Sequence, residues 1–131
     1  MSSNPIIILA VDDSPSMREM LAYLLRSSGF EVVEADDGEK ALALARTRRI
    51  DVVITDQNMP NMDGLALVKS LRDLPTYRDT PIMMLTTESS PEMKQKGREA
   101  GATGWMVKPF DPEKLVKMVK IVAGNRTEAG A

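Results

Sequence analysis

The chain has 131 residues, of which 43% are hydrophobic, so it can fold as one domain around an apolar core without disulfide or structural-metal cross-links. Lys and Arg number 17 against 19 Asp and Glu, and the net charge of -2 supplies no positive field for a nucleic-acid backbone. The chain contains no cysteine and no histidine, which excludes disulfides, imidazole bases and phosphohistidine and leaves carboxylates, hydroxyls and lysine for any chemistry.

The amino terminus lacks the basic region that begins a signal peptide, and its apolar run Ile6–Val11 is far shorter than the roughly 20 residues that span a bilayer. We therefore expect a cytoplasmic protein with no membrane insertion. We also expect an extension over residues 1–5, one domain over residues 6–123, a flexible tail over residues 124–131 and no output domain.

Short apolar runs alternate with stretches of helical period along the whole chain. The runs, which suit strands buried on both faces, are Ile6–Val11, Glu31–Glu34, Val52–Thr55, Ile82–Thr86 and Gly104–Val107. Apolar side chains with helical spacing occur at Met17–Leu24, Ala41–Ala45, Leu67–Leu74 and Leu115–Val122. The remaining helical stretch, Pro91–Ala100, is polar, so we expect that helix to be lightly anchored.

Helix start and stop signals support these assignments. Ser14, Ser90 and Asp111 each precede a proline, which places a capping side chain before a proline at the first helical position. Gly29 and Gly101 lie just beyond helix ends. The alternation predicts a doubly wound α/β fold, in which ligands bind beyond the carboxyl ends of parallel strands.

Polar residues follow four of these predicted strands: Asp12 and Asp13 the first, Asp56 the third, Thr86 the fourth and Lys108 the fifth. Carboxylates gathered in one crevice would repel each other by about 4 kcal/mol per pair at a distance of about 4 Å, so Lys108 and a cation should compensate. Oxygen ligands without histidine or cysteine favour Mg²⁺. Asp56 is the best candidate nucleophile for a phosphoryl group, whose oxygens Thr86 and Lys108 would bind.

Each of these residues also has an ordinary structural interpretation when it is taken alone. Asp13 could cap a helix, Asp56 could be a turn acid before Pro60, and Lys108 could be a solvated surface lysine. Their joint occurrence at four strand ends favours a single functional site, because independent structural roles do not predict that coincidence.

Four motifs that contain these residues resemble the receiver domains of two-component response regulators, most closely single-domain chemotaxis regulators of the CheY type. The motifs are Asp12-Asp13, Asp56 to Gly64, Leu85 to Glu88 and Val107 to Phe110. The resemblance covers about residues 6 to 123. It implies a flavodoxin-like (βα)5 sandwich with a five-stranded parallel sheet in the order 2-1-3-4-5.

The resemblance also implies roles for the acidic residues. Asp56 would be the phosphoacceptor and would join the magnesium site, in which Asp13 is a direct ligand and Asp12 acts through water. Asn58 would contribute its backbone carbonyl to the metal. The side chains of Asn58 and Glu88 would tune the attack of water on the acyl phosphate.

The remaining site roles concern the switch. Thr86 would be the hydroxyl that moves toward the phosphoryl group, and Lys108, before a cis bond to Pro109, the ammonium that bonds it. The chain departs from the family at two positions: Trp105 stands where Tyr or Phe is frequent, and Gln57 where CheY-type proteins often carry an aromatic residue. Trp105 suits packing as well as switching.

The leading hypothesis is a stand-alone signalling module, phosphorylated on Asp56 by a histidine kinase and dephosphorylated slowly, possessing no enzymatic activity toward other molecules. Chemotaxis is the favoured pathway, with the flagellar motor switch as a candidate target, a phosphatase as a further partner and a monomeric state. Its binding face would comprise the polar helix, the fifth strand and the last helix, with lysines for an acidic partner at Lys94, Lys96, Lys114, Lys117 and Lys120. The alternatives are a phosphorelay shuttle, an aspartyl-phosphate phosphatase and a scaffold that needs no phosphorylation.

Overall fold

A computed structural model describes residues 5–130, and the side chains of residues 5–124. Its five strands form one parallel sheet in the order β2-β1-β3-β4-β5, which confirms the order that the resemblance implied. The strands are β1 (Ile7–Val11), β2 (Glu31–Ala35), β3 (Val52–Thr55), β4 (Ile82–Thr86) and β5 (Gly104–Val107). The helices are α1 (Pro15–Ser27), α2 (Gly38–Thr47), α3 (Gly64–Arg72), α4 (Pro91–Ala100) and α5 (Pro112–Gly130), with a short 3-10 helix η1 (Pro75–Tyr77).

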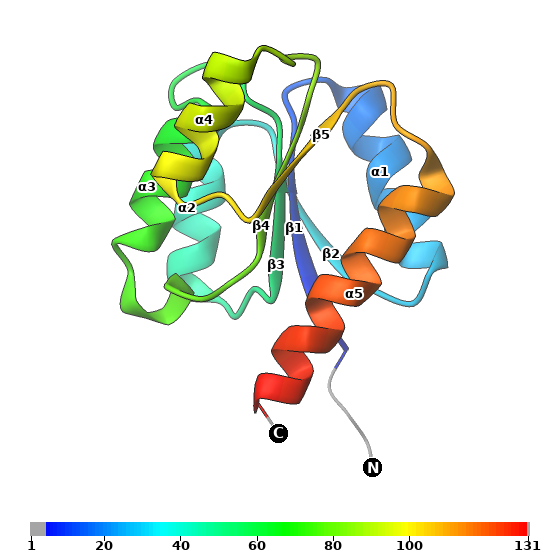
Figure 1. Ribbon diagram of the computed structural model, residues 1–131. Coiled ribbons are helices and arrows are strands. Elements are labelled where there is room, and N and C mark those ends of the chain that lie inside the picture. Colours follow the sequence, from blue (N-terminus) through cyan, green and yellow to red (C-terminus); the bar gives the residue numbers. More distant parts are fainter. Residues whose placement is uncertain (1–4, 131) are drawn as a thin grey trace.

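The helices cover the sheet on both faces, as predicted. α1 and α5 lie on one face, and α2, α3 and α4 lie on the other (Figure 1). An apolar layer fills the space on each side, and every residue of β3 and β4 is buried. None of the helices in the described part is both long enough and apolar enough to cross a membrane.

The predicted caps form at the helix ends. Ser14 Oγ accepts the Met17 N–H at 3.3 Å, and Ser90 Oγ accepts the Met93 N–H at 3.1 Å. Gly101 ends α4 with a φ of 110°, a left-handed conformation that glycine adopts without strain. The sequence assigned residues 124–131 to a flexible tail, but helix α5 continues to Gly130. The side chains of residues 125–130 lie outside the described part. The flexibility of the tail and the domain boundaries stay predictions.

Helix α4 is lightly anchored, as its polar composition predicted. Only Gly97 and Ala100 are buried among its residues. Its carboxyl end is held instead by Arg72 at the end of α3, whose guanidinium donates to the Gly101 carbonyl from Nε at 2.9 Å and from a terminal nitrogen at 2.7 Å. The same guanidinium donates to the carbonyls of Tyr77 and Thr80, both at 2.7 Å. One side chain therefore ties α3, η1 and the end of α4 together.

We predict that Arg72→Lys lowers the free energy of unfolding by about 1.5 to 3 kcal/mol, because a lysine cannot direct planar donors at carbonyls in three separate segments. Urea denaturation followed by circular dichroism measures the change. Arg78→Lys is the matched control, since Arg78 is exposed and should change stability by less than about 0.5 kcal/mol. Equal stability of the two variants would contradict the anchoring role of Arg72.

Candidate functional site

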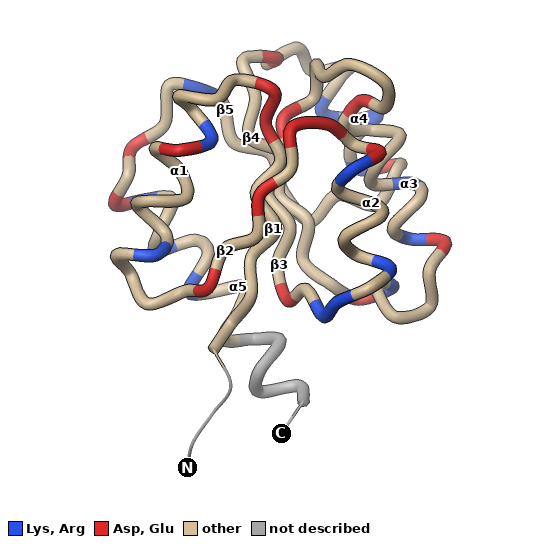
Figure 2. Tube along the Cα trace, turned by 180° about the vertical axis from the view of Figure 1, so that it is seen from behind, with Lys and Arg blue, Asp and Glu red and all other residues tan. Residues whose placement is uncertain are grey.

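The register of the sheet places the acidic strand ends side by side. β1 pairs with β3 so that Val11 lies opposite Thr55, and the next residues along the two strands are Asp12 and Asp56. β1 lies between β2 and β3 in the sheet. The chain passes from β1 to β2 on one side and then crosses back to β3 on the other side, so the strand order reverses at β1. This is the topological switch point at which doubly wound sheets bind ligands. Figure 2 shows acidic segments at the carboxyl ends of the strands.

The acidic pair after β1 is held by its own loop and by α1. Asp12 is only 2% exposed, and its Oδ1 accepts the Ser14 N–H at 2.9 Å. Arg18 donates to the Asp12 carbonyl at 2.7 Å and lies 3.4 Å from Glu34 on the edge strand β2. Asp13, the next residue, is exposed. The pair therefore offers one buried and one solvent-facing carboxylate.

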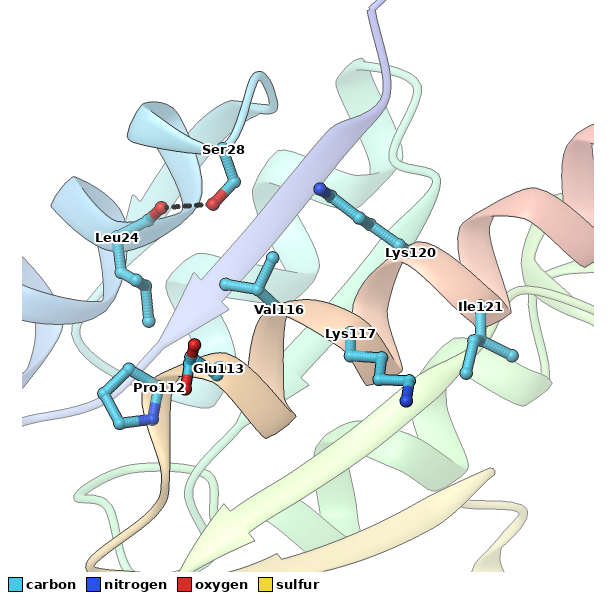
Figure 3. Close-up of a pocket in the computed structure, with 8 residues that line it drawn as sticks. All are labelled: Leu24, Ser28, Pro112, Glu113, Val116, Lys117, Lys120 and Ile121. Atoms are coloured by element: carbon cyan, nitrogen blue, oxygen red, sulfur yellow. Dashed lines mark hydrogen bonds between the residues drawn. The ribbon is translucent and has the colours of Figure 1, made fainter.

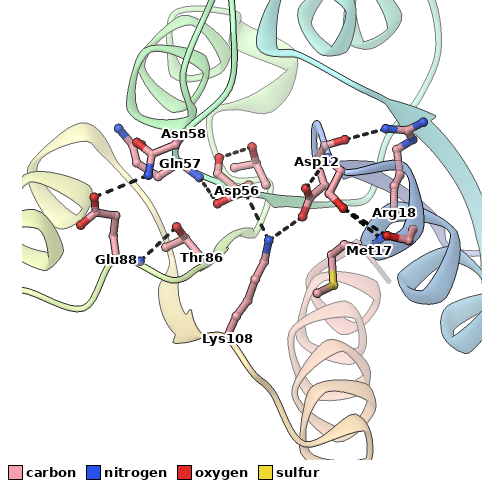
Figure 4. A network of polar contacts seen from close by, with 12 residues as sticks. Asp12, Met17, Arg18, Asp56, Gln57, Asn58, Thr86, Glu88 and Lys108 are labelled. Atoms are coloured by element: carbon pink, nitrogen blue, oxygen red, sulfur yellow. Dashed lines mark hydrogen bonds and ion pairs between the residues drawn. The ribbon is translucent and has the colours of Figure 1, made fainter.

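The two oxygens of Asp56 have different surroundings. Oδ1 accepts the backbone N–H of Gln57 at 2.7 Å, and Oδ2 lies 3.1 Å from the Lys108 ammonium (Figure 4). The Asp56 side chain is 13% exposed, so the carboxylate is only partly open to solvent.

Lys108 joins two of the carboxylates. Its Nζ lies 2.6 Å from Asp12 Oδ2 as well as 3.1 Å from Asp56 Oδ2, and its side chain is 10% exposed. Burial lowers the pKa of Lys108, but the hydrogen bonds and negative charges of Asp12 and then Asp56 outweigh it, so the pKa is raised overall. Lys108 is therefore an ammonium at neutral pH. The bond from Lys108 to Pro109 is cis, as the resemblance implied.

The acid cluster has the chemistry of a site for a hard cation. One carboxylate oxygen from each of Asp12, Asp13 and Asp56 lies within 4.8 Å of the others. Three carboxylates against one ammonium leave a local excess of negative charge, which a divalent ion would neutralise. All-oxygen donors and an exposed side that can retain water fit Mg²⁺ better than zinc. The role of the Asn58 carbonyl in such a site stays a prediction.

Next to the acid cluster, the predicted switch residues Thr86 and Trp105 both contact Glu88. Thr86 is fully buried, and its Oγ1 accepts the Glu88 N–H at 3.3 Å. The indole N–H of Trp105 donates to the Glu88 carbonyl at 2.8 Å. Asn58 Nδ2 lies 3.5 Å from Glu88 Oε1, at the outer limit of a hydrogen bond. The β4–α4 loop thus contacts both the pocket residues and Trp105.

Gln57 has a structural role that the sequence did not reveal. Its side chain is 4% exposed, donates to Asp63 Oδ2 at 3.2 Å and accepts the Leu65 N–H at 2.9 Å. These bonds attach the residue after Asp56 to the first turn of α3. The only signal of this role in the sequence was that Gln57 stands where CheY-type proteins often carry an aromatic residue. The hydrogen-bond partners of Gln57 could not be predicted, because they depend on the path that the loop takes after folding.

A second contact holds the loop between β3 and α3 against the start of α2. Asn61, with a left-handed φ of 68°, donates to Asp37 Oδ2 at 2.8 Å. Asp37 Oδ1 accepts the Lys40 N–H at 2.8 Å. These hydrogen bonds, the Lys40 N–H first, lower the pKa of Asp37.

We predict that the ionisation of Asp37 makes the free energy of unfolding depend on pH in the acidic range. Because the pKa of Asp37 is lower in the folded state than its unfolded value of about 3.9, the ionised side chain stabilises the fold at any pH above that unfolded pKa. This contribution is lost as the pH falls through the pKa of the folded state. Asp37→Asn should therefore flatten the fall in the free energy of unfolding below about pH 5. Urea denaturation of both proteins at several pH values tests this, and parallel pH profiles would contradict it.

We predict opposite effects of Asp13→Asn with and without Mg²⁺. Without the ion, removal of one repelling charge should raise the free energy of unfolding by about 1 kcal/mol. Mg²⁺ at ten times its Kd should stabilise the wild type by about 1.4 kcal/mol and the variant by much less. Thermal denaturation measures both changes. Asp73→Asn, an exposed acid at the end of α3, is the control and should keep the wild-type response.

Comparison with known proteins agrees with this geometry. The model of the response regulator receiver domain family matches residues 8–120. A chemotaxis protein CheY homologue of Campylobacter jejuni is 39% identical over 126 residues, which are 95% of this chain and 97% of that protein. The alkaline phosphatase synthesis transcriptional regulatory protein PhoP of Bacillus subtilis is also 39% identical, over 95% of this chain, and the chain spans about 50% of its length.

Solved structures share the fold. The chemotaxis protein CheY4 of Vibrio cholerae is 52% identical, with a TM-score of 0.87 over 91% of this chain and 99% of that one. The receiver domain of the sensor histidine kinase PA1611 of Pseudomonas aeruginosa is 27% identical, with a TM-score of 0.86 over 92% of this chain and 99% of that one. That structure has a magnesium ion coordinated in its active-site cleft.

Proposed function

The chain belongs to the response regulator receiver domain family, and on this basis we propose that Asp56 accepts a phosphoryl group from the phosphohistidine of a histidine kinase. The observation that carries the proposal is the shared ammonium of Lys108, 3.1 Å from Asp56 Oδ2 and 2.6 Å from Asp12 Oδ2. A partly exposed acceptor carboxylate beside a fixed positive charge suits transfer from a donor on another protein. The donor histidine must come from elsewhere, because this chain has none.

The transfer forms a bond between an Asp56 oxygen and phosphorus, while the bond from phosphorus to the imidazole nitrogen of the donor breaks. Lys108 lies where negative charge gathers on the phosphoryl oxygens. The Gln57 N–H orients the carboxylate through Oδ1 at 2.7 Å. Asp12, Asp13 and Asp56, with the Asn58 carbonyl, would hold Mg²⁺, which when bound supplies further positive charge for those oxygens.

Signalling would follow from the contacts around Glu88. The buried hydroxyl of Thr86 turns from the Glu88 N–H, 3.3 Å away, toward the new phosphoryl group. Because Trp105 donates to the Glu88 carbonyl, a shift of this loop reaches β5 and the face formed with α4. Asn58 and Glu88 border the pocket and would set the rate at which water hydrolyses the acyl phosphate.

The pathway we propose is chemotaxis, in the cytoplasm, with a monomeric protein whose phosphorylated form binds a target such as the flagellar motor switch. It is supported by the 39% identity to a CheY homologue, of which the chain covers 97%, and by the 52% identity to CheY4. A separate phosphatase could shorten the signal. The protein itself would only promote its own phosphorylation and slow dephosphorylation, and a phosphorelay shuttle is the alternative role for the same pocket.

We predict that acetyl phosphate and Mg²⁺ add one labile phosphoryl group to the wild type and none to Asp56→Asn. Intact-protein mass spectrometry detects the adduct, and phosphate release gives its lifetime. Asp73→Asn should be phosphorylated like the wild type. Rapid turnover on phosphomonoesters would indicate an enzyme instead, and a wild type without any adduct would indicate a scaffold.

A further inference from the structure

The guanidinium of Arg18 contacts the loop that carries two of the acids. Its Nη1 donates to the Asp12 carbonyl at 2.7 Å, and its side chain is 19% exposed (Figure 4). Lys108 approaches the same residue from the other side, with its ammonium 2.6 Å from Asp12 Oδ2. Two different cations therefore hold Asp12, one by its carbonyl and one by its carboxylate.

The Asp12 carbonyl belongs to the peptide group that joins the two acids. A peptide group is planar, so a donor held on its oxygen also fixes the direction in which the chain continues to Asp13. Asp13 is exposed, so the backbone rather than packing sets where its carboxylate lies. The hydrogen bond from Arg18 therefore bears on the positions of both carboxylates.

Glu34 on the edge strand β2 holds the guanidinium in this orientation. Nε of Arg18 lies 3.4 Å from Glu34 Oε1, while a different nitrogen reaches the Asp12 carbonyl. A second arginine, Arg26, lies 3.3 Å from Glu34 Oε2 and donates to the Val32 carbonyl at 3.1 Å. A planar guanidinium serves two partners at a fixed angle, and a lysine ammonium cannot reproduce that geometry.

The helix that carries Arg18 is fixed by contacts far from the acids. Leu21 and Leu25 of α1 are buried in the core. Farther along, Leu24 and the capping residue Ser28 line a hollow against α5, and the Ser28 hydroxyl donates to the Leu24 carbonyl at 3.0 Å (Figure 3). We therefore expect α1 to keep its place when the Arg18 side chain is changed, so that the effect is confined to the Asp12–Asp13 loop.

We propose that Arg18 is a positioning residue of the magnesium site. It sets the plane of the peptide group between Asp12 and Asp13 so that the two carboxylates converge on one cation. A guanidinium has no lone pair for a metal, so Arg18 acts through Asp12 and not as a ligand. The inference rests on the proposed metal site and adds to it a residue outside the carboxylate cluster.

Two effects of Arg18 on a bound cation have opposite signs. Its positive charge repels Mg²⁺, although Glu34 neutralises part of that charge, whereas its hydrogen bond holds the Asp12–Asp13 loop in place. Arg18→Lys keeps the charge and loses the planar donors, and Arg18→Met removes both. If charge alone mattered, Arg18→Met would bind Mg²⁺ more tightly than the wild type. If positioning dominates, both variants bind it more weakly.

Isothermal titration calorimetry with MgCl₂ measures the Kd, and circular dichroism checks that each variant is folded. Arg18→Lys and Arg18→Met should each raise the Kd by about tenfold, at the lower end of the range for residues that orient metal ligands. Arg26→Lys is the matched control, because Arg26 also pairs with Glu34 but donates to Val32, and its Kd should change by less than about twofold. Glu34→Gln should raise the Kd of the wild type but not that of Arg18→Lys.

The rate of phosphorylation by acetyl phosphate separates positioning from catalysis. The Mg²⁺ concentration that gives half the maximal rate should rise with the Kd, while the maximal rate of Arg18→Lys stays within about twofold of the wild type. An unchanged Kd in Arg18→Lys, tighter binding by Arg18→Met, or an equal loss in Arg26→Lys would overturn the role of Arg18 alone. A wild type that does not bind Mg²⁺ would overturn the proposed metal site, and this inference with it.

Discussion

The site depends on one electrostatic constraint, the sharing of the Lys108 ammonium between the carboxylates of Asp12 and Asp56. The parallel pairing of β1 with β3 brings these acids together, and their repulsion would oppose that register without a compensating charge. Lys108 supplies only part of the compensation, since Asp13 adds a third carboxylate. The remaining negative charge is what a divalent cation would neutralise, so the repulsion between the acids and the proposed metal site have the same origin.

Such a cluster works only if the loops that carry it stay in place. The pocket-forming loop after β3 is attached on one side by Gln57 to the start of α3 and on the other by Asn61 to Asp37. Gly64 allows that loop to fold tightly, because a Cβ there would collide with the Asp56 carbonyl oxygen. Within this fixed loop, one oxygen of Asp56 accepts the Gln57 N–H, while the second oxygen stays directed at Lys108.

The fold and the acid cluster could be predicted from the sequence because each depends on a local signal. Buried strands appear in the sequence as apolar runs, and helix starts are marked by capping residues before prolines, such as Ser14 and Ser90. The acid cluster is marked by polar residues that directly follow the predicted strands. The contacts of Gln57, Arg72 and Asp37 could not be predicted, because each joins segments whose separation is fixed only after the chain has folded.

Trp105 illustrates how a departure from a family pattern can be accommodated elsewhere in the chain. An added Cβ at Gly97 would lie 2.7 Å from the indole ring, so the glycine in α4 makes the space that the larger ring occupies. A glycine weakens a helix interior, and α4 already buries little else. The larger aromatic ring therefore packs against a helix that buries few other side chains. The indole N–H on the Glu88 carbonyl then connects the ring packed against α4 to the loop beside Asp56, which is the route by which the proposed phosphorylation would reach this helix.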